Sequence, residues 1–350
     1  MARYLASTDL TGFDPFAGLL SPAARLLPRG LPQQVWLRAT AARGGLGLRL
    51  SGVPRIRMAK TIALVLLAQA VHPSPSLRTP LLMQDLEHKR STDGGWGYEF
   101  DAQLRWGRYS AGASNAIATA FATEARTSPT GIEDPVLLRY LMRDLRDPRG
   151  FFRYSAGNPV LIYNANALIS RTVARLGGPR ETVLSSIDWT LKARNASGIW
   201  GYGDGQNLGW ADSYHNAYIT WVLQDLADMG FVSHDVVDES TDLWLRLFFD
   251  STGFAKLLVS DHEPTHDINA VATALYWLCT IKRPNGLIES RIQATARQLL
   301  SWQRADGSVG VGSGRFPRWG DAPSLLGLAA LVKWLERSKA DTAAPAVIDT

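Results

Sequence analysis

Residues 198–226 read GIWGYGDGQNLGWADSYHNAYITWVLQDL, a turn rich in glycine and tryptophan followed by polar side chains and then an apolar helical run. Asp212, Tyr214 and His215 stand together where that helix is expected to begin. Whether this arrangement is local or repeated decides the fold, because regular recurrence along a chain indicates an array of supersecondary units.

The glycine turn does recur. Its copies are RSTDGGWGY (90–98), RDPRGFFRY (146–154), RNASGIWGY (194–202), FDSTGFAKL (249–257) and QRADGSVGV (303–311). The glycine returns every ~48–56 residues, a spacing typical of helix-pair repeats. A fainter first copy is expected in RGGLGLRL, near Gly47.

Two kinds of helix alternate around these turns. Ahead of a turn lies an amphipathic helix, such as DPVLLRYLMRDL (134–145), and behind it lies an alanine-rich helix that is apolar nearly all round, such as HDINAVATALYWL (266–278). The first inner helix is expected in RMAKTIALVLLAQAV (57–71). Helices that are apolar on every side must be buried, and closing them into a ring buries them all. The sequence therefore predicts an all-α protein, an (α/α)6 toroid or barrel of six helix hairpins with short glycine-aromatic loops.

The predicted organisation is an N-terminal arm at residues 1–30, the toroid domain at residues 31–338 and a disordered tail at residues 339–350. With 350 residues, 46% of them hydrophobic, the chain can bury a large core. The longest apolar run, residues 61–71, is shorter than the ~20 residues of a membrane-spanning helix. No secretory signal is recognisable, and Cys279 is the single cysteine. We therefore expect a cytoplasmic protein.

The net charge of +5 comes with arginines scattered along the chain. Without a zinc-finger or RNA-binding signature, this pattern predicts no nucleic-acid partner. Arginine suits two-point pairing with carboxylate or phosphate, which favours acidic partners. The expected partner is a small-molecule or oligosaccharide substrate. The N-terminal arm is expected to provide a peripheral contact with a membrane or a biosynthetic complex.

In a toroid, the polar clusters at the starts of the inner helices face one shared mouth. The candidate catalytic residues are Asp212, Tyr214, His215 and Asp267. The candidate substrate-binding residues are Trp96, Glu99, Asp101, Arg105, Trp106, Asn115, Tyr163, Asn164, Asn166, Tyr202, Trp210, His266, Asn269, Arg318 and Trp319. Aromatic faces and carboxylates around a deep opening suit a ring-shaped ligand.

Helix capping is the alternative interpretation for several of these residues. Aspartate and asparagine before an apolar helix are the usual N-caps, which applies to Asp212, Asn115 and Asp321. Capping does not account for the neighbouring Tyr214 and His215. No metal is expected, since Pro264 breaks the helical register between His262 and His266, and the absence of nucleotide-binding motifs predicts no cofactor.

The repeated turns resemble the QW-type repeats of the terpene cyclase and prenyltransferase-like toroid superfamily, with Gln303, Gly307 and Val309 as the nearest match. Arginine stands in place of the glutamine at positions 90, 146 and 194. The Asp-x-Asp-Asp acid motif of class II terpene cyclases does not occur in the chain. This resemblance implies the toroid fold.

From about residue 54 to 335 the chain is similar to helical-toroid proteins of bacterial polysaccharide biosynthesis clusters. Over a short span, DSYHNAY (212–218) also resembles the helical domain of glucuronyl C5-epimerases, with Tyr214 and His215 matching its Tyr-His segment. The resemblance implies a carbohydrate-active enzyme of glycan biosynthesis, an isomerase/epimerase or lyase that abstracts a proton from a uronate-like sugar.

In this hypothesis, Tyr214 and His215 transfer protons and Asp212 or Asp267 orients the histidine. Arg318 or Arg105 holds the uronate carboxylate, and Trp96, Trp106 and Trp210 stack on the sugar. Two alternatives remain open: a terpenoid cyclase-like enzyme that folds an isoprenoid or other apolar chain in the cavity, with a lone acid at Asp212 or Asp267, and a non-catalytic glycan-binding protein. The polarity of the cavity distinguishes sugar from prenyl chain.

Overall fold

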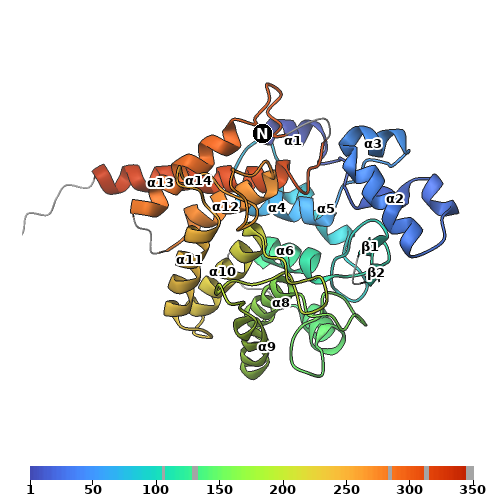
Figure 1. Ribbon diagram of the computed structural model, residues 1–350, viewed down its shortest axis with the longest axis horizontal. Helices are drawn as coiled ribbons and strands as arrows, with labels where there is room; N and C mark the ends of the chain where they lie inside the picture. The colour runs from blue at the N-terminus through green and yellow to red at the C-terminus, as the bar shows by residue number, and fades with distance from the viewer. Residues whose placement is uncertain (105–106, 128–132, 283–285, 311–314, 344–350) are drawn as a thin grey trace, which may run out of the picture.

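Six helices form the inner wall of the computed structural model, which describes residues 1–104, 107–127, 133–282, 286–310 and 315–343 (Figure 1). They are α4 (Ala59–Val71), α6 (Ala116–Thr127), α8 (Tyr163–Arg175), α10 (Ser213–Asp228), α12 (Ile268–Thr280) and α14 (Asp321–Ala343). Each packs against the next along the chain, and α14 returns to pack against α4. The ring is therefore closed, and the predicted all-α (α/α)6 toroid is confirmed.

The outer helices cover this ring. They are α5 (Thr79–His88), α7 (Pro135–Tyr140) with its π-helical continuation η3 (Leu141–Leu145), α9 (Arg180–Lys192), α11 (His234–Leu247) and α13 (Gly286–Leu300). In Figure 1, α9, α11 and α13 lie on the outside of the molecule. The short α1 (Ala2–Ser7) packs against α14, so the start of the chain covers its last inner helix.

The five glycine turns share one backbone geometry. Gly94, Gly150, Gly198, Gly253 and Gly307 have φ between +79° and +110°. In each turn the glycine N–H donates to the carbonyl three residues earlier, as Gly150 does to Asp147 at 2.9 Å. A side chain is strained in this region of φ, which explains the repeated glycine. The expected copy near Gly47 is not such a turn, because Gly47 lies inside a helix, α3 (Gly44–Leu50).

The turns are anchored by their aromatic residues and by the inner helices. Trp96 and Trp200 are fully buried, and their indole N–H groups donate to outer-helix carbonyls, of Leu86 in α5 and Thr190 in α9. The fourth residue of three inner helices accepts the N–H of a turn residue. These residues are Thr119, Asn166 and Asn216, whose partners are Trp96, Phe152 and Trp200.

The remaining elements precede or interrupt the ring. The N-terminal segment contains η1 (Ala17–Leu20), η2 (Ala23–Leu26), α2 (Leu31–Ala42) and α3. A hairpin of β1 (Ala102–Leu104) and β2 (Gly107–Tyr109) pairs antiparallel, with Ala102 opposite Tyr109. Figure 1 shows α2 and α3 beside this hairpin at the edge of the molecule. No described helix combines the length and apolar character needed to cross a bilayer.

Candidate functional site

A cavity of about 740 Å³ is formed by the inner helices, the β hairpin and the N-terminal segment. Much of its lining is aromatic: Phe16, Tyr98, Phe100, Tyr154, Tyr202, Trp210, Tyr214, Tyr218 and Trp319. Leu37, Ile117, Leu208, Leu257 and Leu258 add aliphatic surface. The charged groups and the histidine on the lining are Arg38, Lys60, Asp212, His215, Asp267 and Arg318. The cavity is thus largely apolar, with a few polar groups that can fix or protonate a ligand.

Asp212 both caps α10 and orients His215. One carboxylate oxygen, Oδ1, accepts the backbone N–H of His215 at 2.8 Å, and Oδ2 lies 2.7 Å from Nδ1 of the same histidine. A carboxylate accepts hydrogen bonds, which makes Nδ1 the donor in this contact. In a neutral imidazole with its proton on Nδ1, Nε2 is the nitrogen that can accept a proton.

Aromatic rings surround the imidazole of His215. Tyr202 and Trp210 stack with centroids 4.6 Å apart, and His215 meets Tyr202 edge-on at 4.8 Å. The ring of Tyr214 is tilted against that of His215, with the two ring centroids 4.1 Å apart. These contacts restrict the rotamer of His215, so the Asp212–His215 pair is held in one orientation.

Asp267 is a second carboxyl group on the cavity wall. Its Oδ1 caps α12 by accepting the N–H of Ala270 at 2.8 Å. Burial, supported by the charge of Asp212, raises the pKa of Asp267. Burial also raises the pKa of Tyr214 well above its ordinary value, with Asp212 and Asp267 adding to the shift. Tyr214 is therefore a neutral phenol whose hydroxyl can donate a hydrogen bond to a ligand, and Asp267 holds its proton more readily than an exposed aspartate does.

Lys60 is the functional candidate that the sequence analysis missed. It is 5% exposed, and its amine lies 4.7 Å from the ring centre of Phe121 and within 6 Å of Tyr218 and Trp319. Burial, with a smaller effect of Arg318, lowers the pKa of Lys60 to about 7. The second residues of four inner helices line the cavity, namely Lys60, Ile117, Asn164 and Tyr214. This register is the sequence signal that identifies Lys60.

Arg318 lines the cavity but is already paired. Its guanidinium donates to both carboxylate oxygens of Asp14, at 2.5 and 2.8 Å, and the indole of Trp319 donates to Asp14 at 3.2 Å. The rings of Tyr98 and Trp319 each lie 4.6 Å from the guanidinium carbon. Much of the hydrogen-bonding capacity of Arg318 is thus used within the protein, which leaves less of it for a substrate carboxylate.

The structure brings together about half of the residues proposed from the sequence. Nine of them line the cavity: Asn164, Tyr202, Trp210, Asp212, Tyr214, His215, Asp267, Arg318 and Trp319. Arg105 and Trp106 lie outside the described residues. The remaining eight are not among the lining residues: Trp96, Glu99, Asp101, Asn115, Tyr163, Asn166, His266 and Asn269.

Several of these eight have structural contacts instead. Asn115 caps α6 by accepting the N–H of Ala118 at 3.0 Å, and Asn166 bridges its turn to Ser186 and Thr190. Glu99 accepts the N–H of Ala59, the first residue of α4. Asp101 is bound by Arg108 of the β hairpin.

The others fall into the core or onto the surface. Trp96 is fully buried, with Arg90 stacked on its ring at 5.1 Å. Asn269 is buried, and among the described residues its amide has no hydrogen-bond partner. His266 is exposed and packs near Trp302. Within the described ranges, no cluster of three or more histidine, cysteine, aspartate or glutamate side chains could hold a metal ion.

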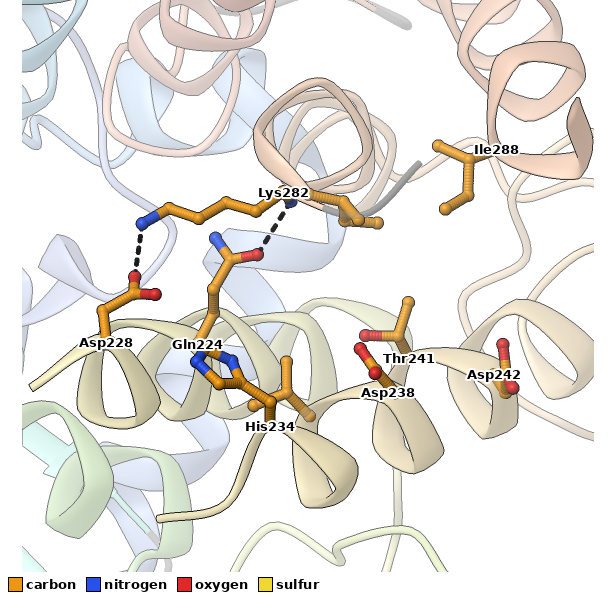
Figure 2. Close-up of a pocket in the computed structure, with 10 residues that line it drawn as sticks. Gln224, Asp228, His234, Asp238, Thr241, Asp242, Lys282 and Ile288 are labelled. Atoms are coloured by element: carbon orange, nitrogen blue, oxygen red, sulfur yellow. Dashed lines mark hydrogen bonds and ion pairs between the residues drawn. The ribbon is translucent and has the colours of Figure 1, made fainter. Parts of the chain in front are cut away.

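A second pocket of about 460 Å³ lies between α10, α11 and the end of α12 (Figure 2). Figure 2 shows Lys282 reaching Asp228, while its backbone N–H donates to Gln224 at 3.0 Å. His234 and Asp238 lie on α11 at the rim. Lys282 pairs with Asp228, and the carboxyl groups of Asp238 and Asp242 also line this pocket.

No protein-family model and no curated protein matches this sequence. Solved structures do match the fold. A possible member of the GH105 family from Klebsiella pneumoniae aligns with a TM-score of 0.60 at 12% identity, over 95% of this chain and 92% of that one. The type II terpene cyclase MstE from Scytonema aligns with a TM-score of 0.54 at 15% identity, over 96% of each chain.

A third match is ent-copalyl diphosphate synthase from Streptomyces platensis, with a TM-score of 0.54 and 18% identity over 93% of this chain and 60% of that one. At such identities the likeness shows the fold alone. The protein has the helical-toroid fold that terpene cyclases share with a GH105-like protein. This agrees with the terpene-cyclase-like part of the resemblance noted in the sequence.

Proposed function

We propose that the protein is a terpenoid cyclase-like enzyme, which protonates an unsaturated apolar chain in the toroid cavity and closes it into rings. The observation that supports this proposal is the predominantly aromatic and aliphatic lining of the cavity. A sugar needs many hydrogen-bond partners, whereas a prenyl chain needs apolar surface and shape. MstE, one of the structures with a similar fold, has been solved with geranylgeranyl dihydroxybenzoate as substrate.

Asp267 is the proposed proton donor. Its carboxyl group faces the cavity, and burial raises its pKa, which favours the protonated form. In the first step the carboxyl proton moves to an alkene carbon, and the electron pair of the double bond forms the new C–H bond. A carbocation remains on the neighbouring carbon, and a second double bond of the same chain attacks it to close a ring.

The aromatic lining stabilises the carbocation, because the faces of aromatic rings attract positive charge. The Lys60 amine already lies near two rings of this lining, 5.8 Å from the centre of Tyr218 and 5.9 Å from that of Trp319. The final step removes a proton from the last carbocation. Nε2 of His215 is suited to accept it, since Asp212 holds the ring and stabilises the imidazolium that results. The overall reaction is an isomerisation that consumes no co-reactant.

The test is incubation with polyprenyl substrates in heavy water, followed by mass spectrometry of the products. Geranylgeranyl dihydroxybenzoate and geranylgeranyl diphosphate are suitable first substrates. We expect a cyclised product that carries solvent deuterium at the protonated carbon, and no product with Asp267→Asn, which keeps the helix cap. His266→Gln, outside the cavity, is the matched control. If the protein binds the prenyl substrates of a panel and converts none of them, the proposal is overturned.

The Asp212–His215 pair also fits the abstraction of a proton from a sugar, so an epimerase or lyase acting on a uronate is the second candidate. Arg318, the cation proposed for the uronate carboxylate, is already paired with Asp14, so Arg38 or Lys60 of the lining would have to stabilise the enolate that forms when the proton leaves. Deuterium uptake into uronate glycans that depends on His215 would favour it. Glycan binding without uptake, unchanged in His215→Ala, would indicate a non-catalytic glycan-binding protein.

A further inference from the structure

The N-terminal part of the chain has an unusual charge composition. Residues 22–55 contain six arginines and neither aspartate nor glutamate. Arg25, Arg29, Arg38, Arg43 and Arg49 are exposed, and none of them forms an ion pair with any residue that the structure describes. A surface of this kind keeps its positive charge and attracts an anionic partner.

Large apolar side chains are exposed in the same segment. Leu26 is 86% exposed, Leu31 71%, Val35 56%, Leu46 56% and Leu50 78%. Single exposed leucines are common on protein surfaces, but a concentration in one short segment marks a contact surface.

The spacing of these residues groups them. Leu31 and Val35 are four apart on α2, and Leu46 and Leu50 are four apart on α3, so each pair shares one side of its helix. The helices α2 and α3 pack against each other. We call these four residues, together with Leu26, the N-terminal apolar surface.

An apolar groove of about 500 Å³ opens between η2, α2 and α3. Pro22, Ala23, Trp36, Gly47 and Leu50 line it, and Arg43 is the charged side chain at its wall. Leu50 thus belongs both to the groove and to the N-terminal apolar surface. Apolar space next to a cation matches a lipid, which has an acyl chain below an anionic headgroup.

We infer that the N-terminal apolar surface docks on an anionic phospholipid bilayer, with its leucines inserted among the acyl chains and its arginines at the phosphates. Charge complementarity selects this partner. Asp101 lies within electrostatic reach of Arg29, but none of the five exposed arginines forms an ion pair with a described residue, which fits a negatively charged membrane surface. The inference concerns binding and goes beyond the proposed function. Its test needs no turnover, so the two proposals succeed or fail separately.

The docking surface adjoins the cavity. Gln34, Leu37, Arg38 and Ala41 of α2 line the cavity, while Leu31 and Val35 of the same helix are exposed. A bilayer bound at α2 would therefore lie next to the part of the cavity wall that α2 forms.

The experiment is flotation of the full chain with phosphatidylcholine vesicles and with phosphatidylcholine–phosphatidylglycerol vesicles. We expect binding to the anionic vesicles that weakens as salt is added. The charge variant Arg25→Gln/Arg29→Gln/Arg49→Gln should bind about a hundredfold more weakly, at about fivefold for each arginine. The apolar variant Leu26→Gln/Leu31→Gln/Leu50→Gln should lose binding at least tenfold.

Matched controls come from the opposite end of the chain. Leu287→Gln/Leu300→Gln on α13 removes two leucines that are 48% and 45% exposed and lie outside the N-terminal apolar surface, and it should bind as the parent does. Light scattering gives the oligomeric state of every variant. Absence of vesicle binding, equal binding to neutral vesicles, or apolar variants that change only the oligomeric state would each overturn the inference.

Discussion

Asp14 and Arg318 are 304 positions apart in the chain and form a two-point ion pair at the wall of the cavity, with side chains 0% and 4% exposed. The pair joins the N-terminal segment to the turn that begins α14. Trp319 and Tyr98 close around it. The N-terminal segment is therefore part of the cavity wall.

Removing one partner of this pair should destabilise the protein strongly. Asp14→Asn leaves a buried guanidinium without its counter-charge, and we expect a loss of about 3–5 kcal/mol in the free energy of unfolding. Denaturant unfolding measures it. Asp9→Asn is the control, because Asp9 is 75% exposed in its pair with Arg57 and should cost less than ~1 kcal/mol. Equal losses in the two variants would contradict the prediction.

Asp212→Asn should separate capping from catalysis. Asparagine caps helices as well as aspartate does, so stability should change by less than ~0.5 kcal/mol. Without the carboxylate, His215 loses its orientation and the stabilisation of its protonated form, and kcat should fall at least about a hundredfold. Steady-state kinetics and thermal unfolding together test this. A variant that loses stability and activity in parallel would indicate a purely structural role.

Lys60 should make stability depend on pH. Its folded-state pKa is about 7, below the ordinary value, so between pH 7 and pH 10 the unfolded chain binds more protons than the folded one. The free energy of unfolding contributed by Lys60 therefore rises with pH over this window. Lys60→Met removes that rise and should stabilise the protein most at pH 7 and below.

Urea unfolding at several pH values measures this difference between Lys60→Met and the parent. Lys192→Met provides the control, since the Lys192 side chain is 77% exposed. A parent and Lys60→Met with parallel pH profiles would show that the amine stays charged in the folded protein.

Gly150→Ala should cost about 1–2 kcal/mol of stability through its backbone conformation. Gly150 has φ +110°, and the nearest atom to an added Cβ is 3.7 Å away. The methyl group of alanine therefore has space, but the backbone of alanine is strained at this φ. Gly209→Ala is the control, because Gly209 has neither a positive φ nor an atom within 4 Å of the added carbon. Comparable thermal midpoints for the two variants would count against a conformational requirement.

The fold could be predicted because its signals are local. Each signal can be recognised within a short stretch of sequence. Examples are a glycine such as Gly198, which a positive φ requires, and an inner helix that is apolar on all sides, such as α12. The closure of the ring follows from burying those helices. The position of Asp14 could not be predicted, because its partner Arg318 meets it only after the ring has closed.

The site was harder to predict because capping position does not fix side-chain direction. Asn164 and Asn166 are two residues apart in the first turn of α8. Two residues correspond to a rotation of about 200° around a helix, so the two side chains point to opposite sides. Asn164 therefore reaches the cavity, and Asn166 holds the turn. Lys60 could not be found from its surroundings, because it stands in an otherwise apolar helix. Only its place as the second residue of an inner helix indicates that it lines the cavity.

In three inner helices, α6, α8 and α10, the second residue lines the cavity and the fourth residue holds the preceding turn. Ile117 and Thr119 on α6 show the separation, as do Tyr214 and Asn216 on α10. Evolution can exchange the residues of the first kind while those of the second keep the architecture intact. A single scaffold can in this way acquire new selectivity at little structural risk, which gives a physical reason why toroids with so few shared residues remain superimposable.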